Sequence, residues 1–289
     1  MSRHELHDPG RGLALNLGGL EVTAFSISGL ATWIAVPSLD ACFDLGHCTV
    51  EVSRLRNVLL SHAHQDHSLG VVRHLSLRAM TGARPSRVYL PEESREPMLA
   101  MLRAYERLEG KSDGDFEANV HGVSAGETFE LSPRHRVHAF DATHRLPSRG
   151  YTVLETRRKL LDKFAGLPGE ALRDARAAGE ELYSFHERAT LTYVGDSTID
   201  TLERHPEVGQ SDVLFLEATH LPGTSPEVSA KYGHTHLEEL AALHLRAPEA
   251  LASPHVVLKH FSMKYARGDI LAARDRLPAG LRERVTMLV

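Results

Sequence analysis

Cysteine is scarce in this chain of 289 residues, where Cys42 and Cys48 are the only two. Two thiols are too few for the disulfide framework of a small secreted domain, and they fit a reducing compartment. Both could serve as metal ligands, although structural thiols are the more common case. The fold is therefore expected to depend on a hydrophobic core and not on disulfides.

Long apolar segments are also missing. None approaches the roughly 18 consecutive apolar residues that a membrane-spanning helix needs. The N-terminal sequence MSRHELHDPGRGL lacks the apolar stretch of a secretory signal. The hydrophobic content of 42% and the charged content of 25% are ordinary for a soluble globular chain. These features predict a cytoplasmic protein without a membrane partner.

A surplus of positive charge is absent as well. The 33 Lys and Arg residues are outnumbered by 38 Asp and Glu, which gives a formal net charge of −5. Nucleic-acid-binding proteins usually carry a basic balance, so any RNA-binding function must rest on a local basic patch. Histidine, in contrast, is abundant, with 19 residues. Because His is the commonest metal ligand in proteins, its clusters are the first place to look for a site.

Strand and helix signals alternate along the chain, and no repeat, low-complexity tract or long linker interrupts them. Strand-like runs include LEVTAFSIS, NVLLSH, HRVHAFDA, ATLTYVGD, DVLFLEAT and HVVLKHF. Helical periodicity occurs in SLGVVRHLSLRAM, PEESREPMLAMLRAYERLE and HTHLEELAALHL. The pattern predicts an α/β fold with one domain over residues 1–289. The charged segment RRKLLDKFAGLPGEALRDARAAGEEL shows helical periodicity that is broken at GLPG.

The segment SHAHQDH follows an apolar strand and contains four potential metal ligands, His62, His64, Asp66 and His67. Alternate residues of an extended segment point to the same side, so His62 and His64 can bind one ion. Asp66 and His67 lie where the chain turns into the next helix and can address a second ion. Imidazole and carboxylate ligands suit zinc. A polar loop with histidines by chance is the alternative, but four such residues at a strand end favour a metal site.

Two ions need further ligands, and three candidates stand at the ends of later strands. His144 follows HRVHAFDAT, Asp196 lies in YVGDS, and His260 ends HVVLKH. Each alone is a weak signal, because a single polar residue at a strand end is more often structural. Together with the first cluster they complete a dinuclear set.

SHAHQDH resembles the H-x-H-x-D-H signature of the metallo-β-lactamase superfamily. From about residue 20 onward the chain is similar to short-form tRNase Z (ribonuclease Z), a tRNA 3′-processing endonuclease, and especially to its plant-type form. The matching motifs include ATHRLPSRGY, KFAGLPGEAL, TYVGDS, LEATH, YGHTH and KHFSMKY. The resemblance implies an αββα sandwich, in which two mixed sheets lie between helix layers.

The resemblance also implies a ligand set for two Zn²⁺ ions, which Mn²⁺ or Fe²⁺ could replace. One ion would be bound by His62, His64 and His144. The other would be bound by Asp66, His67 and His260, with Asp196 bridging the two.

Two further motif residues imply phosphodiester chemistry. Glu217 in LEATH and His234 in YGHTH match the family's paired acidic and histidine positions near the scissile phosphate. A His oriented by a Glu can protonate a departing 3′-oxygen, and Asp66 could orient the attacking water. The alternative for His234 is a polar residue that caps a helix. The implied activity is removal of the 3′ trailer from precursor tRNA by a homodimer.

Several residues remain open between a functional and a structural role. Asp44 in FDLG either supports a ligand histidine or forms a turn. Ser262, Lys264 and Tyr265 either line the substrate channel or form a loop. The resemblance also implies an inserted arm, which here is a short helical insertion at about residues 157–188. The basic run RRK that begins at Arg157 is its best candidate contact with tRNA, but acidic residues in the same insertion offset its charge.

Two other functions compete with tRNA processing. A hydrolase with the same metals could act on a small phosphodiester, a lactone or a thioester, although the Glu217–His234 pair favours phosphodiesters over acyl substrates. A non-catalytic RNA-binding module is the third hypothesis, and the complete ligand set argues against it.

Overall fold

The computed structural model describes residues 8–112, 114–116 and 119–289. Among these residues the strands form two mixed sheets, one of eight strands and one of seven. The first sheet has the order β1-β2-β3-β4-β5-β6-β7, and β14 pairs with β2. Its strands are β1 (Leu13–Leu17), β2 (Leu20–Ser28), β3 (Ala31–Val36), β4 (Ala41–Leu45), β5 (Asn57–Leu59), β6 (Arg87–Pro91), β7 (Val120–Val123) and β14 (Phe261–Ser262).

The second sheet has the order β15-β13-β12-β11-β10-β9-β8. In each sheet the early strands pair antiparallel and the later strands pair parallel. Parallel neighbours bring the C-terminal ends of their strands to one edge, where ligands of α/β proteins commonly bind. The strands are β8 (Thr128–Ser132), β9 (His135–Asp141), β10 (Arg149–Leu160), β11 (Tyr183–Tyr193), β12 (Val213–Glu217), β13 (His255–Lys259) and β15 (Val285–Met287).

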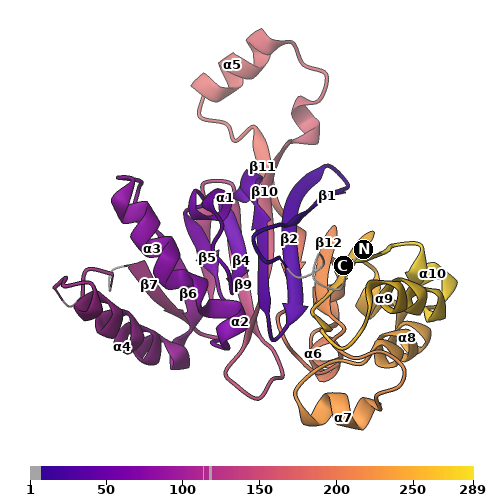
Figure 1. Ribbon diagram of the computed structural model, residues 1–289. Helices are drawn as coiled ribbons and strands as arrows, with labels where there is room; N and C mark the ends of the chain where they lie inside the picture. Colours follow the sequence, from indigo (N-terminus) through magenta and orange to yellow (C-terminus); the bar gives the residue numbers. More distant parts are fainter. Residues whose placement is uncertain (1–7, 113, 117–118) are drawn as a thin grey trace.

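Helices cover the outer face of each sheet (Figure 1). Those of the first half are α1 (Val50–Ser53), α2 (Gln65–Ser68), α3 (Gly70–Met80) and α4 (Glu92–Leu108). Those of the second half are α6 (Asp200–Arg204), α7 (Pro226–Lys231), α8 (Leu237–Arg246), α9 (Arg267–Ala273) and α10 (Ala279–Arg282). No helix of the described residues combines the length and the apolar character that crossing a bilayer requires.

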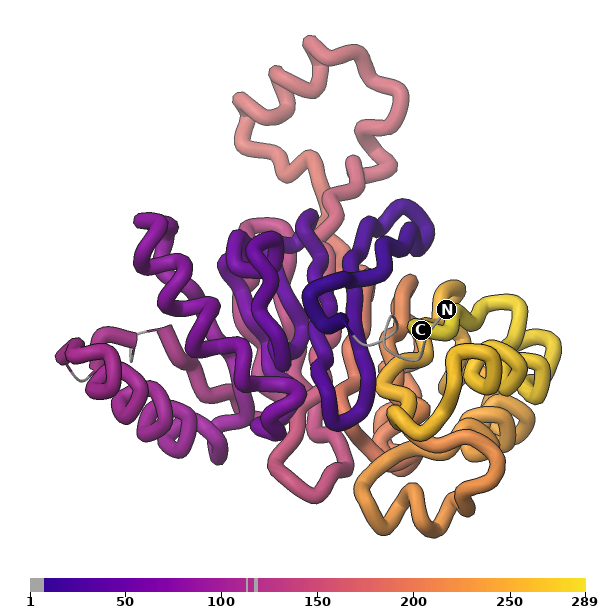
Figure 2. The backbone as a smooth tube through the Cα atoms, viewed as in Figure 1, coloured from indigo at the N-terminus to yellow at the C-terminus, as the bar shows by residue number. Residues whose placement is uncertain are grey.

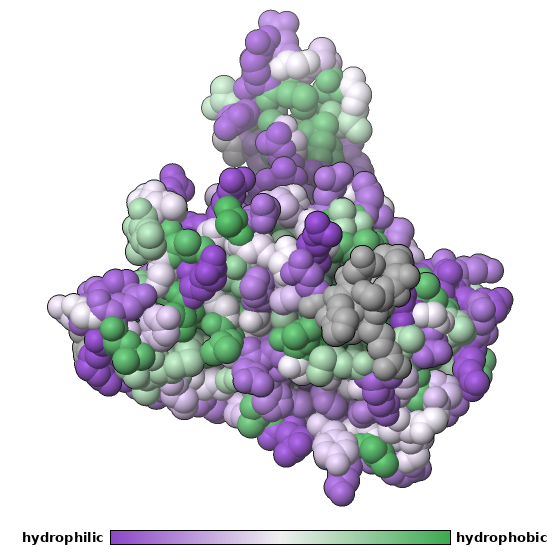
Figure 3. Space-filling model, viewed as in Figure 1, coloured by the Kyte–Doolittle hydropathy of each residue, from purple (hydrophilic) through white to green (hydrophobic). Residues whose placement is uncertain are grey.

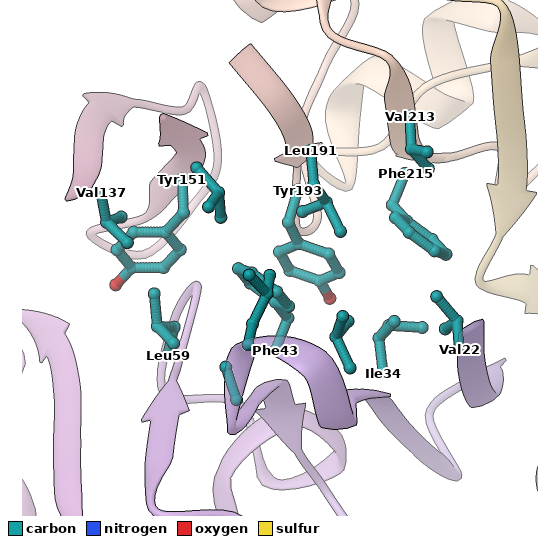
Figure 4. Close-up of a cluster of buried hydrophobic side chains, with 14 of the residues drawn as sticks. Val22, Ile34, Phe43, Leu59, Val137, Tyr151, Leu191, Tyr193, Val213 and Phe215 are labelled. Atoms are coloured by element: carbon teal, nitrogen blue, oxygen red, sulfur yellow. The ribbon is translucent and has the colours of Figure 1, made fainter. Parts of the chain in front are cut away.

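Three apolar cores join these layers. The central core lies between the sheets and contains Ile34, Phe43, Tyr151, Tyr193 and Phe215 (Figure 4). A second core joins the first sheet to α3 and α4, and a third joins the other sheet to α8 and α9. Both cysteines are buried as free thiols, in agreement with a structural role. The layers therefore follow the order helix, sheet, sheet, helix, and the predicted αββα class is confirmed.

The insertion at about residues 157–188, which was expected to be helical with a break at GLPG, begins and ends as strands. Arg157, Arg158 and Lys159 continue β10, because they pair in an antiparallel ladder with residues 184–186 of β11. A helix occurs only beyond this ribbon, as η4 (Asp162–Phe164) and α5 (Gly169–Ala177). We call residues 161–182 the arm. Figures 1 and 2 show that it projects from the body on the two strands, and in Figure 3 hydrophilic side chains gather where these strands leave the body.

Candidate metal centre

The predicted metal ligands all follow strand ends at one edge of the sandwich. His62 and His64 come after β5, and α2 then places Asp66 and His67. The other three residues are His144 in the β9–β10 loop, Asp196 after β11 and His260 after β13. Although these residues are far apart in sequence, the structure brings all seven together.

The first group consists of His62, His64 and His144. The Nδ1 atom of His64 lies 2.9 Å from Nε2 of His62 and 3.4 Å from Nε2 of His144. With one oxygen of Asp196, the four potential ligand atoms lie within 4.8 Å of one another. Three ring nitrogens thus converge with a carboxylate on a single position.

The second group consists of Asp66, His67 and His260, all buried. The Nε2 atoms of His67 and His260 are 3.1 Å apart, and Oδ2 of Asp66 lies 3.7 Å and 3.5 Å from them. Asp196 faces both groups, because its Oδ2 lies 3.8 Å from His62 Nε2 and its Oδ1 lies 3.4 Å from His67 Nε2. This placement suits a carboxylate that bridges two ions.

The hydrogen bonds behind the histidine rings show that the residues fit metal ions. His62 Nδ1 lies 3.0 Å from Ser61 Oγ, His144 Nδ1 lies 2.9 Å from the carbonyl of Gly233, and His67 Nδ1 lies 2.7 Å from Asp44. A proton donated from each of these Nδ1 atoms leaves the lone pair of Nε2 facing the centre. The Oδ1 atom of Asp196 is buried and accepts no hydrogen bond from the described residues. Lone pairs and an unpaired carboxylate oxygen need a cation between them, so the buried clusters are consistent with a dinuclear metal site.

The charges within the centre favour the ligand forms of His62 and Asp66. Burial and the neighbouring His67 lower the pKa of His62 well below its usual value. Burial opposes the charge of Asp66, yet the hydrogen bond and charge of His260 and the charge of His67 lower its pKa to about 2. Neutral imidazole and ionised carboxylate are the forms that bind metal. Burial lowers the pKa of His67, but the charges of Asp196 and Asp44 raise it to about 10, so this ring gives up a proton when metal binds.

Asp44 supports a ligand histidine, which is one of the two roles that the sequence left open, and it does not form a turn. It lies within β4 at a bulge, where the register with β3 shifts, and its φ is 52°. Its buried carboxylate also accepts hydrogen bonds from His67 Nδ1 at 2.7 Å, from the Ser61 amide at 2.6 Å and from the hydroxyl of Tyr193. The bulge therefore aims a carboxylate that fixes the ring of a predicted ligand.

Glu217 and His234 meet beside this centre. His234 Nδ1 lies 2.9 Å from Glu217 Oε1, and the carboxylate is fully buried, whereas the His234 side chain is 15% exposed. Burial opposes protonation, but the charge and hydrogen bond of Glu217 raise the pKa of His234 to about 9. A protonated imidazole at the edge of the centre can donate a proton to a bound substrate.

The helix-cap alternative for His234 does not hold. The residue that caps α8 is His236, whose Nδ1 accepts from the Glu238 amide at 3.1 Å and whose own amide donates to Glu239. The structure does add another reading, because His234, Asp196 and His260 also place ligand atoms within 4.8 Å of one another. His234 is thus either a proton donor or a metal ligand, and metal analysis of a variant separates the two.

Two buried residues of the centre were missed by sequence reasoning. Lys259 is fully buried above the ring of Tyr193, 4.6 Å from its centroid, and its Nζ makes no hydrogen bond with described residues. Thr219 places its hydroxyl against Glu217, His234 and His260. The only available signal was the presence of polar residues next to apolar strand ends, which does not identify their partners.

Other predicted contacts lie outside the centre. Lys264 donates to Thr224, and the hydroxyl of Tyr265 accepts from the Leu221 amide at 3.0 Å, so both hold the loop after β12. At the base of the arm, Arg157 and Arg158 line a groove of about 720 Å³ with the exposed Phe185. Arg157 pairs there with Glu155 at 2.7 Å, and Lys159 pairs with Asp162 at 3.3 Å. These acids reduce the positive charge of the RRK run.

Residues 35–261 match the family model described as the beta-lactamase superfamily domain. Among curated proteins, the chain is 28% identical over 278 residues to tRNase Z TRZ1 of Arabidopsis thaliana, with 95% of this chain and 97% of that protein covered. It is 36% identical over 235 residues to ribonuclease BN of Salmonella gallinarum, with 73% of this chain and 72% of that protein covered.

The fold has counterparts among solved structures. The chain resembles human tRNase Z, short form (ELAC1), with a TM-score of 0.54 and 17% identity over 96% of this chain and 94% of that one. At this identity the likeness concerns the fold alone. The fold, the match over residues 35–261 and the buried His and Asp clusters all indicate a metal-binding domain of this family.

Proposed function

Because the chain belongs to the metallo-β-lactamase superfamily and is related to tRNase Z, we propose that it is a metal-dependent endonuclease that removes the 3′ trailer of precursor tRNA. The observation that carries this proposal is the Glu217–His234 pair, 2.9 Å apart beside the clustered ligands. Cleavage of an RNA phosphodiester that leaves a 3′-hydroxyl releases a strongly basic sugar oxygen, and a proton donor such as His234 assists its departure.

The proposed metal ligands are His62, His64 and His144 for one ion and Asp66, His67 and His260 for the other, with Asp196 between them. Zinc is the proposed metal, because the ligands are imidazoles and carboxylates without thiolate. When bound, two such ions would lower the pKa of a water between these residues and would stabilise the negative charge on the phosphate.

The chain's own side chains contribute positioning and proton transfer. Asp66 would orient the attacking water through its carboxylate. His234 donates its proton to the departing 3′-oxygen, and Glu217 holds the ring so that Nε2 faces the substrate. The products would be a tRNA with a 3′-hydroxyl and a trailer with a 5′-phosphate.

The arm is the proposed contact for the body of the tRNA. β10 begins beside the centre, where the Arg149 amide donates to the Ser61 carbonyl. The strand has twelve residues, so at about 3.3 Å per residue it places the arm roughly 40 Å away. Only an extended substrate could contact both places. A homodimer, in which the arm of one protomer serves the centre of its partner, is part of the same proposal.

The second candidate function is hydrolysis of a small phosphodiester. The observation in its favour is the pairing of Arg157 and Lys159 with acidic side chains, which weakens the basic patch that RNA binding needs.

To separate the two candidate functions, the zinc-loaded protein is incubated with a 3′-extended precursor tRNA and, separately, with bis(p-nitrophenyl) phosphate. Cleavage next to the discriminator base, lost in His64→Ala, supports tRNA processing. Hydrolysis of the small diester without a cut in the RNA supports the second candidate.

A further inference from the structure

Thr219 connects the Glu217–His234 pair to a proposed metal ligand. It lies two residues after the end of β12 and is almost completely buried. Its hydroxyl oxygen is 2.6 Å from Glu217 Oε2, 2.9 Å from His260 Nδ1 and 3.3 Å from His234 Nδ1. One small side chain therefore contacts members of both parts of the site.

The chemistry of these groups determines the direction of the hydrogen bonds. An ionised carboxylate can only accept, so the single hydroxyl proton of Thr219 goes to Glu217 at 2.6 Å. The oxygen of Thr219 is then left as an acceptor, and the Nδ1–H of His260 donates to it. With its proton on Nδ1, His260 directs the lone pair of Nε2 toward Asp66 and His67, which lie 3.5 Å and 3.1 Å away.

The backbone at His260 is strained. His260 has a φ of 64°, in the left-handed region that residues other than glycine rarely adopt. Strained residues persist only where the surrounding structure holds them, and the hydroxyl of Thr219, 2.9 Å from His260 Nδ1, is one of the contacts that do so. The Glu217 carboxylate is held at both oxygens, because Oε1 accepts from His234 Nδ1 at 2.9 Å and from the Ser197 amide at 3.0 Å, while Oε2 accepts from Thr219.

We propose that Thr219 is a positioning residue. It fixes the tautomer and the orientation of His260 for one of the two ions. It also connects that ligand to Glu217, the carboxylate that orients His234. This inference rests on the proposed dinuclear centre. It assigns to Thr219 a role that acts through His260 and Glu217, and it predicts that loss of the hydroxyl weakens one metal position and leaves the other intact.

The test measures zinc affinity by competition with a chromophoric chelator, for which no substrate is needed. Wild type is compared with Thr219→Val, which keeps the shape without the hydroxyl, and with Thr219→Ser, which keeps the hydroxyl. Thr192→Val is the matched control, because Thr192 is also fully buried and hydrogen-bonded, to Thr152 at 3.1 Å in the sheet. Circular dichroism checks folding, and Thr219→Ala replaces Thr219→Val if the valine variant is unfolded.

We expect Thr219→Val to bind one of the two ions roughly 10–100-fold more weakly, as is typical when a residue behind a metal ligand is removed. Thr219→Ser and Thr192→Val should bind both ions as wild type does. Wild-type affinity for both ions in Thr219→Val overturns the inference, and so does equal weakening in Thr219→Ser. Failure of the proposed function has a different signature, in which wild type binds two ions but leaves precursor tRNA uncut.

Discussion

The Nδ1 atom of His234 lies 2.9 Å from Oε1 of Glu217, and this contact joins a fully buried carboxylate to a ring that reaches the surface. Because Nδ1 is bound to Glu217, Nε2 is the nitrogen left to meet a substrate. The carboxylate in turn is held by the Ser197 amide at 3.0 Å and by the Thr219 amide at 2.9 Å. The pair is therefore rigid on its buried side and open on the other, as a proton donor requires.

Metal content should separate the roles of His64 and His234. We expect His64→Ala to lose metal and activity together, because its Nδ1 atom faces both His62 and His144. His234→Ala should retain two ions per chain and lose activity on RNA by roughly 10²–10⁴-fold, the usual contribution of general acid catalysis. Elemental analysis after gel filtration gives the metal content. Equal metal loss in both variants would assign His234 to the ligands instead.

Replacement of Asp44 should weaken metal binding without removing a ligand. Asp44→Asn keeps the size of the side chain but withdraws the charge that faces His67 Nδ1 at 2.7 Å. We expect zinc affinity to fall about 10–100-fold. Asp40→Asn is the matched control, since Asp40 also has a positive φ, of 49°, but accepts from the Arg56 amide away from the centre. Unchanged affinity in Asp44→Asn would show that its hydrogen bond to His67 does not contribute to metal binding.

His74 should make the protein sensitive to acid. Burial, together with the charge of Arg78, lowers the pKa of His74 from 6.5 to about 3. Below pH 6.5 the unfolded chain gains a proton that the folded chain does not, so stability falls as pH decreases from about 6.5 toward 3. The slope from this residue is at most about 1.4 kcal/mol per pH unit. Urea unfolding between pH 7 and pH 5 should show a smaller loss of stability in His74→Gln than in wild type, and equal losses would contradict the assignment.

Removal of the arm should affect RNA and small substrates differently. Leu160 and Tyr183 are paired across β10 and β11, so an Asn-Gly turn can replace residues 161–182 and close the ribbon. We expect hydrolysis of bis(p-nitrophenyl) phosphate to remain unchanged, because the centre lies at the other end of β10. Cleavage of precursor tRNA should fall by roughly tenfold or more, equivalent to about 1.4 kcal/mol of lost binding. Undiminished cleavage of precursor tRNA would remove the arm from the proposal.

The positions of the clustered residues could be predicted because each follows a recognisable strand. His62, Asp196 and His260 come directly after apolar runs, and strand ends meet at one edge once the sheets form. The ordinary composition and the alternation of strands and helices indicated the α/β class, and motif resemblance supplied the four-layer order.

The features that could not be predicted depend on partners far away in sequence. Lys259 and Thr219 look like ordinary polar residues until folding places them beside Tyr193 and His260. In the insertion, the charged run RRKL was expected to be helical, but its pairing with β11 makes it a strand. The local charge pattern does not distinguish a helix from a strand here, because either one leaves the charged side chains of RRKL in water.

The account is tested most directly by the rate of His234→Ala on two substrates that differ in their leaving group. Precursor tRNA releases a sugar oxygen that must be protonated, whereas bis(p-nitrophenyl) phosphate releases a weakly basic phenolate that leaves without a proton. If His234 supplies that proton, the variant should lose about 10²–10⁴-fold on the RNA and remain close to wild type on the small diester. Equal losses on both substrates, or a wild-type protein that leaves precursor tRNA uncut, would contradict the account.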